Sequence, residues 1–222
     1  MIVQCRLSNK RLPNKLLKKL NGKPSISYFL DRIKLIKAEK AFALADEEKV
    51  HKLESILLKN NYDLIYKGSV NNVLKRFYET AKKFKIKNII RVTSDCIFFD
   101  PYLVNKGIDL FFKKKLDYLS NNLINTYPKG LDYEIFTFKA LEYAAINAKK
   151  KYDKEHVTPY LKRSSKIKKF NISNNKKYSS NISWTLDTKK DLYTFKKLFL
   201  NKKFLIAEKL YKWKLLDKYM KK

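Results

Sequence analysis

The opening stretch MIVQCRLSNKRLPNK places four cationic side chains directly after a short apolar run: Arg6, Lys10, Arg11 and Lys15. A loop between a strand end and a helix can bind phosphate groups with such cations and with its backbone N–H groups. Only six of the 51 basic residues are arginine, and two of the six fall here. Because guanidinium groups match phosphate geometry better than ammonium groups do, the stretch predicts a phosphate-binding loop. The alternative is a solvated basic turn.

Two aspartates end apolar segments that lie far apart in the sequence. Asp95 ends IIRVTSD, and Asp187 ends SWTLD. Ligands of open α/β sheets bind at the carboxyl ends of the strands, so both carboxylates are expected in the same crevice. Two carboxylates in one crevice supply the hard oxygen ligands that a divalent cation takes beside phosphate oxygens and waters. The alternative is that Asp95 caps a helix and Asp187 merely precedes one.

The elements that must position these residues alternate between strand and helix patterns. Apolar periodicity predicts strands at 1–5, 41–45, 62–68 and 87–95, and helices at 23–38, 47–60, 71–84 and from Asp100–Pro101 onward. Alternation of this kind predicts an α/β fold with a mostly parallel sheet.

Beyond residue 116 the alternation is less regular. We expect strands at 117–122, 132–138, 167–173 and 181–187, and helices at 139–150 and 190–200, the last preceded by a capping box of Thr188 and Asp191. The tail 208–222 is amphipathic and is expected to be a helix packed through Leu210, Trp213 and Leu216. No linker or repeat divides the chain, so residues 1–222 are expected to form one domain with a small antiparallel insertion. Of the four glycines, Gly22, Gly68 and Gly130 lie in polar breaks, which indicates a backbone requirement.

Composition narrows the class of protein. A hydrophobic fraction of 45% argues against disorder, and no run is long and apolar enough for a membrane span or a secretory signal, so a cytoplasmic protein is expected. Cys5 and Cys96 are expected to be small buried residues rather than a disulfide. The net charge of +30 would suit a nucleic-acid partner. Because the basic residues are almost all lysine, we interpret the positive charge as lysines spread over solvated surfaces, and we expect no specific nucleic-acid ligand.

Five ordered segments carry a family resemblance: QCRLSNKRLPNKLLKKLNGKP, RVTSDCIFFDP, TYPKGLDYEIFTFKALE, EHVTPYL and WTLDTKKDL. They resemble the cytidylyltransferase-like family of spore coat polysaccharide biosynthesis, which is similar to the synthetases of CMP-Kdo and CMP-sialic acid. The resemblance implies a three-layer α/β/α, glycosyltransferase-A-like fold. It also implies a reaction in which CTP and a hydroxyl of a sugar or sugar acid give CMP-sugar and pyrophosphate, with Mg²⁺.

The resemblance assigns roles residue by residue. It implies that Arg6, Leu7 and Ser8 bind the nucleotide, with Ser8 and the loop amides nearer the base and ribose. Arg11 and Lys15 are expected to contact the β- and γ-phosphates and to be catalytic together with Asp95. Lys10 has no such match. Asn14 replaces a family glycine, a mild change because asparagine tolerates left-handed backbone.

Four further positions follow from the same resemblance. Arg76 and Ser94 are expected near the nucleotide, Ser94 at a position where the family usually has glycine, so its side chain could crowd the ligand. Glu134 and His156 are expected on the side where the sugar enters, and Asp95 and Asp187 are the implied metal ligands. For Arg76 the alternative is a helix-surface arginine, and for His156 a structural histidine.

Two other classes of function remain as alternatives. A nucleic-acid-binding protein would use the basic surface and ignore triphosphate identity, and a non-catalytic relative would bind nucleotide without turnover. Similar enzymes are often dimers, and a homodimer is compatible with this sequence.

Overall fold

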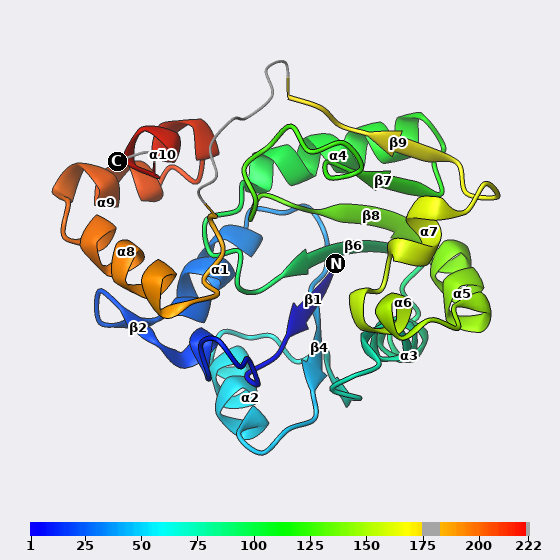
Figure 1. The fold of residues 1–222 in the computed structure, drawn as a ribbon, viewed down its shortest axis with the longest axis horizontal. Helices are drawn as coiled ribbons and strands as arrows, with labels where there is room; N and C mark the ends of the chain where they lie inside the picture. Colours follow the sequence, from blue (N-terminus) through cyan, green and yellow to red (C-terminus); the bar gives the residue numbers. More distant parts are fainter. Residues whose placement is uncertain (175–182, 221–222) are drawn as a thin grey trace.

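A seven-stranded sheet forms the centre of the protein, as the computed structural model of residues 1–174 and 183–220 shows (Figure 1). β1 (Ile2–Cys5) pairs in parallel with both β4 (Ala41–Ala45) and β6 (Asn88–Thr93). Outside these three strands lie β5 (Ile65–Gly68) on one side and β8 (Glu134–Thr137), β7 (Tyr118–Ser120) and β9 (Lys169–Asn171) on the other. Within this sheet β8 runs antiparallel to both of its neighbours. The prediction of a mostly parallel α/β sheet is confirmed.

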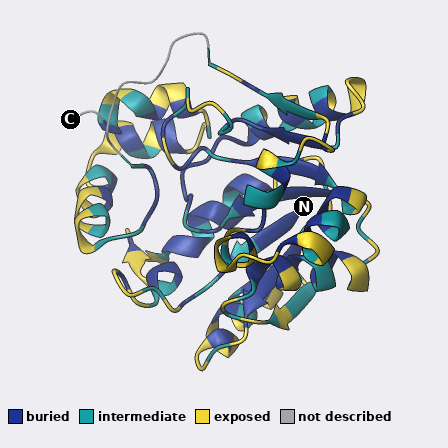
Figure 2. Cartoon of the chain, turned by 45° about the vertical axis from the view of Figure 1, so that its right-hand side comes forward, coloured by how far each residue is buried: buried dark blue, intermediate teal, exposed yellow. Residues whose placement is uncertain are grey.

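Helices cover both faces of the sheet and create two apolar cores. The first core includes side chains of α1 (Ser25–Ile33), α2 (Val50–Lys59), α4 (Pro101–Lys113), α8 (Lys189–Phe199), α9 (Lys202–Glu208) and α10 (Trp213–Met220). The second includes side chains of α3 (Val73–Lys83), α5 (Phe138–Asn147) and α7 (Pro159–Arg163). The sheet is the buried layer between them (Figure 2). None of the helices in residues 1–174 and 183–220 is long and apolar enough to cross a membrane.

Side-chain alternation along the strands explains the two cores. Val3 and Cys5 of β1 belong to the first core, whereas Ile2 belongs to the second, because successive side chains of a strand point to opposite faces. By the same alternation Gln4 of β1 and Arg91 of β6 lie on the face of the second core. The apolar strand β4 is buried along its whole length, as expected for a parallel strand covered on both faces. Cys5 and Cys96 are buried and unbridged, as predicted.

Helix starts follow the predicted caps. Asp100 accepts backbone hydrogen bonds from Tyr102 at 2.8 Å and Leu103 at 3.0 Å, and its other carboxylate oxygen accepts the N–H of Trp213 at 3.0 Å. One side chain therefore caps α4 and fixes the start of α10. Thr188 and Asp191 form the predicted capping box at the start of α8.

Several predictions of local structure were wrong. Residues 183–187 do not form a strand, and residues 181–182 of that prediction lie outside the described residues. The C-terminal segment is not one helix: α9 ends at Glu208 and α10 begins at Trp213, with Tyr211 at φ 55° between them. Leu210 lies in that break and is exposed, whereas Trp213 and Leu216 are buried as predicted. The hairpin of β2 (Lys19–Leu20) and β3 (Lys23–Pro24), α6 (Lys151–His156) and α7 lacked apolar periodicity and were missed.

Gly130 has a backbone that only glycine adopts easily, and it sits against the segment that carries Asp187. Its φ is +102°, and a Cβ there would lie 2.8 Å from the carbonyl carbon of Trp184. The N–H of Trp184 donates to the carbonyl of Lys129 at 2.8 Å. The close approach of these two backbones therefore fixes the chain three residues before Asp187.

Replacing Gly130 by alanine should lower the free energy of unfolding by about 2–4 kcal/mol, because strain at positive φ adds to a backbone collision. Gly22→Ala is the matched control: its φ is +79°, but a Cβ there would meet nothing within 4 Å. The control should cost only about 1 kcal/mol. Urea unfolding of both variants measures the difference, and equal losses would show that the contact with Trp184 is unimportant.

Candidate active site

A cavity of about 200 Å³ opens at the carboxyl ends of β1 and β6. These strands and the residues just after them form its floor. The loop that follows β1 forms one wall, and α6 forms the other. The lining residues are Gln4, Arg6, Asn9, Lys15, Val73, Thr93, Ser94, Asp95, Glu155, His156 and Asp187. The site therefore lies where parallel sheets of this kind bind their ligands.

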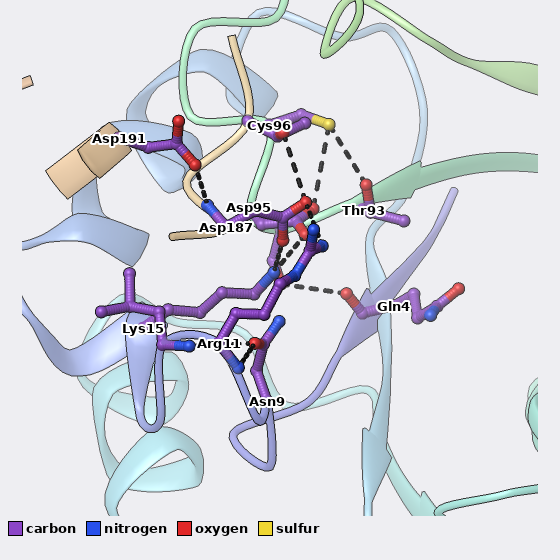
Figure 3. Close-up of polar contacts among 12 residues, drawn as sticks. Gln4, Asn9, Arg11, Lys15, Thr93, Asp95, Cys96, Asp187 and Asp191 are labelled. Carbon is purple, nitrogen blue, oxygen red and sulfur yellow. Dashed lines mark hydrogen bonds and ion pairs between the residues drawn. The ribbon is translucent and has the colours of Figure 1, made fainter. Parts of the chain in front are cut away.

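Lys15 holds the two aspartates together (Figure 3). Its ammonium nitrogen contacts the Oδ2 atom of Asp95 and lies 2.6 Å from Oδ1 of Asp187. Arg11 reaches the other carboxylate oxygen of Asp187 at 3.2 Å. Burial alone would lower the pKa of Lys15, but the two carboxylates outweigh it and raise that pKa. Burial opposes ionisation of Asp187 as well, yet the cations around it lower its pKa.

The loop after β1 turns so that Lys15 points inward. Asn9 Oδ1 accepts the backbone N–H groups of Arg11 at 2.9 Å and Leu12 at 3.1 Å. Asn14 adopts the left-handed conformation expected of it, with φ 55°, and its N–H donates to the carbonyl of Leu7 at 3.0 Å. These contacts close the loop immediately before the short 3₁₀ helix that starts at Lys15.

Glu47, which the sequence did not single out, organises the start of the same loop. Its carboxylate accepts the backbone N–H of Leu7 and, at 2.9 Å, that of Ser8. Arg6 lines the cavity, Leu7 is buried and Ser8 is exposed. Oriented backbone amides of this kind favour anionic partners. The contact could not have been inferred from the sequence, because Glu47 is one of several acidic residues in a polar turn.

Ser94 lies at the cavity floor, and Arg76 lies behind it. Arg76 is almost completely buried, on the helix face of the cavity-lining Val73, and donates to the carbonyl of Ser69 at 2.6 Å. Its Nε and Nη2 atoms have no hydrogen-bond partner among the described residues, and burial lowers its pKa to about 10. Ser94 lines the cavity but turns its hydroxyl to the carbonyl of Gln4, at 2.9 Å, instead of toward the open space.

The two residues expected beside the sugar are placed differently from one another. His156 lines the cavity from the end of α6 and is exposed. Glu134 is only 2% exposed and does not line the cavity. Both of its carboxylate oxygens are engaged by neighbouring side chains, so Glu134 lies behind the cavity wall.

The donor set at the cavity suits magnesium. Asp95 and Asp187 supply hard carboxylate oxygens from segments far apart in the chain, and Lys15 shows that one cation fits between them. In the described part of the chain, no group of three or more histidine, cysteine, aspartate or glutamate residues is arranged so that it could hold a metal ion. Two carboxylates are the number Mg²⁺ takes when phosphate oxygens and waters complete its shell.

Comparison with known proteins agrees with this geometry. The sequence profile of the family described as Cytidylyltransferase matches residues 1–212. The chain belongs to this cytidylyltransferase family. A solved cytidylyltransferase from Leptospira borgpetersenii superposes with a TM-score of 0.83 at 29% identity, covering 90% of this chain and 85% of that one.

Two curated proteins are also similar to this cytidylyltransferase family member. An uncharacterised protein of Methanocaldococcus jannaschii is 34% identical over 200 residues, which cover 89% of this chain and 81% of the relative. The spore coat polysaccharide biosynthesis protein SpsF of Bacillus subtilis is 28% identical over 211 residues, which cover 89% and 85% respectively. The resemblance found in the sequence is therefore confirmed at the level of the family.

Proposed function

We propose that this protein transfers the CMP group of CTP to a hydroxyl of a sugar or sugar acid and releases pyrophosphate. The observation that carries the proposal is the convergence of Asp95 and Asp187 on one cation, beside the cationic loop of residues 6–15. The same arrangement supports Asp95 and Asp187 as ligands of Mg²⁺. When bound, the metal supplies positive charge that stabilises the phosphate oxygens during the transfer.

The chain's own residues bind and orient the triphosphate. Lys15 and Arg11 both contact Asp187 in the ligand-free protein, and we assign their ammonium and guanidinium groups to the β- and γ-phosphates once the metal ion takes their place at the aspartates. The carboxylate of Glu47 holds the amides of Leu7 and Ser8, so Arg6 is the residue of this part of the loop that lines the cavity. We place it at the end of the cavity that Val73 lines. We assign this end to the ribose and base, with Arg76 behind it and Ser94 on the floor.

The wall formed by α6 is the natural side for the acceptor. His156 lines it beside Glu155, and both side chains can hydrogen-bond sugar hydroxyls. The similarity to SpsF supports a product used in surface polysaccharide or glycan biosynthesis. We further propose that residues 1–222 act as one nucleotidyltransferase domain.

A thermal-shift panel of CTP, UTP, GTP and ATP, with and without Mg²⁺, tests the proposal. A ligand that binds only the folded protein stabilises it by about 2.7 kcal/mol at 100 times its Kd. CTP with Mg²⁺ should therefore raise Tm by several degrees more than the other nucleotides do. Equal shifts with all four, or none, would contradict a CTP-specific site. A duplex DNA that raised Tm at physiological salt, with no response to CTP, would favour the nucleic-acid alternative instead.

A further inference from the structure

Glu134 is the centre of a buried polar cluster behind the cavity. Its Oε1 accepts hydrogen bonds from Tyr118 Oη at 2.6 Å and Thr158 Oγ1 at 2.7 Å, and Lys162 Nζ lies 3.0 Å from the same oxygen. Its Oε2 pairs with the guanidinium of Arg91. Four groups from β6, β7 and the α6–α7 segment thus meet on one carboxylate.

This carboxylate stays charged despite its burial. Desolvation alone would raise its pKa, but Arg91, Lys162 and the two hydroxyl donors outweigh the desolvation and lower the pKa to about 2. Removing one partner of a buried charged pair leaves the other uncompensated, which is costly. The contacts of Glu134 are therefore expected to hold their geometry.

Arg91 extends the cluster to the cavity floor. Arg91 and Glu134 are directly paired across β6 and β8, and Gln4 lies on the same face of the neighbouring strand β1. The second guanidinium nitrogen of Arg91 donates to Gln4 Oε1 at 3.0 Å. Because a guanidinium only donates, the oxygen of the Gln4 amide must face Arg91, and the NH₂ group must face away from it. Gln4 lines the cavity, so this orientation offers a ligand a donor.

Thr158 extends the cluster to the opposite wall. The preceding residue, Val157, has φ 70° and ψ −58°, and the N–H of Thr158 donates to the carbonyl of His156 at 2.8 Å. This is a γ-turn with positive φ, a rare and strained conformation, and here it is centred on a fully buried β-branched residue. Strain of this kind persists only where the surroundings hold it in place. The hydroxyl of Thr158 on Glu134 is one such restraint.

We propose that Glu134 is a positioning residue that sets both sides of the cavity, fixing the Gln4 amide through Arg91 and the His156 turn through Thr158. The sequence placed Glu134 in contact with the sugar. In the structure Glu134 lies behind the cavity wall and, through Arg91 and Thr158, holds residues that line the cavity, instead of lining it itself. If the protein binds CTP as proposed above, the Gln4 NH₂ group donates to an acceptor atom of the nucleotide, whereas His156 faces the acceptor sugar.

Arg91→Lys tests the first arm of the proposal, the connection from Glu134 through Arg91 to Gln4. Lysine keeps the charge, but one ammonium cannot reproduce the contacts that the guanidinium makes with both Glu134 and Gln4. The matched control is Arg163→Lys, which changes another arginine paired with a buried carboxylate, that of Asp153, away from Gln4. In ligand-free protein, ¹⁵N relaxation of the Gln4 side-chain NH₂ should show a marked loss of order in Arg91→Lys and none in the control. In the presence of Mg²⁺, the Kd of the Arg91→Lys protein for CTP should rise roughly fivefold, the effect of losing one hydrogen bond.

Thr158→Val tests the second arm of the proposal, the connection from Glu134 through Thr158 to the His156 turn. Valine removes the hydroxyl at nearly constant volume, and Thr158→Ser keeps a hydroxyl at this position. Exchange of the Thr158 backbone amide should quicken at least about tenfold in the valine variant and return toward the wild-type rate in the serine variant.

The outcomes of the two experiments are separable from the proposed function. Unchanged Gln4 order in Arg91→Lys, or a change equal to that in Arg163→Lys, would overturn the first arm. A backbone amide at residue 158 that exchanges as slowly in the valine variant as in the wild type would overturn the second arm. If both ligand-free effects appear but wild-type protein binds no CTP, the positioning role of Glu134 stands and the proposed function fails.

Discussion

Asp95→Asn and Asp187→Asn should each reduce magnesium-dependent release of pyrophosphate from CTP by at least about 100-fold. On the proposed function, each change removes one of the two anionic ligands of a shared metal ion. The charge stabilisation supplied by such an ion amounts to several kcal/mol, and each 1.4 kcal/mol is equal to a factor of ten in rate. Both side chains line the cavity and neither belongs to the two apolar cores, so the fold is expected to survive each change. A coupled pyrophosphate assay measures the loss, and circular dichroism checks the fold.

Asp109→Asn is the control, since it makes the same chemical change on an exposed position of α4. It should leave turnover unchanged. Near-normal activity in either cavity variant would remove that aspartate from the metal site. A folded Asp187→Asn protein whose activity returns at high Mg²⁺ would still agree with the account, because a weakened site fills at higher metal concentration.

Lys15→Ala and Arg11→Ala should weaken binding of CTP roughly 10- to 100-fold while changing binding of CMP only slightly. Hydrogen bonds to charged groups contribute about 1.5–3 kcal/mol each, and only the triphosphate reaches the β- and γ-phosphate positions. Titration calorimetry with both nucleotides measures the ratio. Lys10→Ala is the control, because Lys10 belongs to the same loop, is exposed and does not line the cavity.

The Lys15 variant carries a second effect that must be separated from the first. Without the ammonium, Asp95 loses the ion pair with Lys15 and Asp187 keeps only its contact with the exposed Arg11, so two neighbouring carboxylates are poorly compensated and the metal-free protein is destabilised. Mg²⁺ should restore its Tm, whereas the exposed Arg11 needs no such rescue. Equal losses of CTP and CMP affinity would move Lys15 and Arg11 to the α-phosphate or the nucleoside.

The sequence predicted where the two aspartates meet, although one of the reasons was wrong. Asp95 follows a true strand, but Asp187 does not. The segment before it still lies beside the carboxyl end of β6, because the N–H of Leu186 donates to the carbonyl of Asp95 at 3.0 Å. An apolar run ending in aspartate therefore predicted the location of Asp187 but not its backbone conformation.

Other features depend on contacts that no local pattern encodes. The alternation in DYEIFTF predicts a strand, but only the register of β8 against β6 places Glu134 opposite Arg91. A β-branched residue at positive φ, as at Val157, contradicts local preference and is set by tertiary contacts. Lys15 was expected to contact phosphate. That it bridges two carboxylates became visible only when the structure placed the loop beside the carboxyl ends of the strands.

Transfer of CMP from CTP can be followed at both ends of the triphosphate in one reaction. CTP labelled at the α-phosphate is incubated with the protein, Mg²⁺ and a mixture of cellular sugars, and pyrophosphate is counted in parallel. The α-label should appear in a CMP ester heavier than CMP, in equal amount to the pyrophosphate released, and Asp95→Asn should form neither product. Tight binding of CTP with no pyrophosphate and no labelled ester, across a complete sugar mixture, would contradict the proposed transfer.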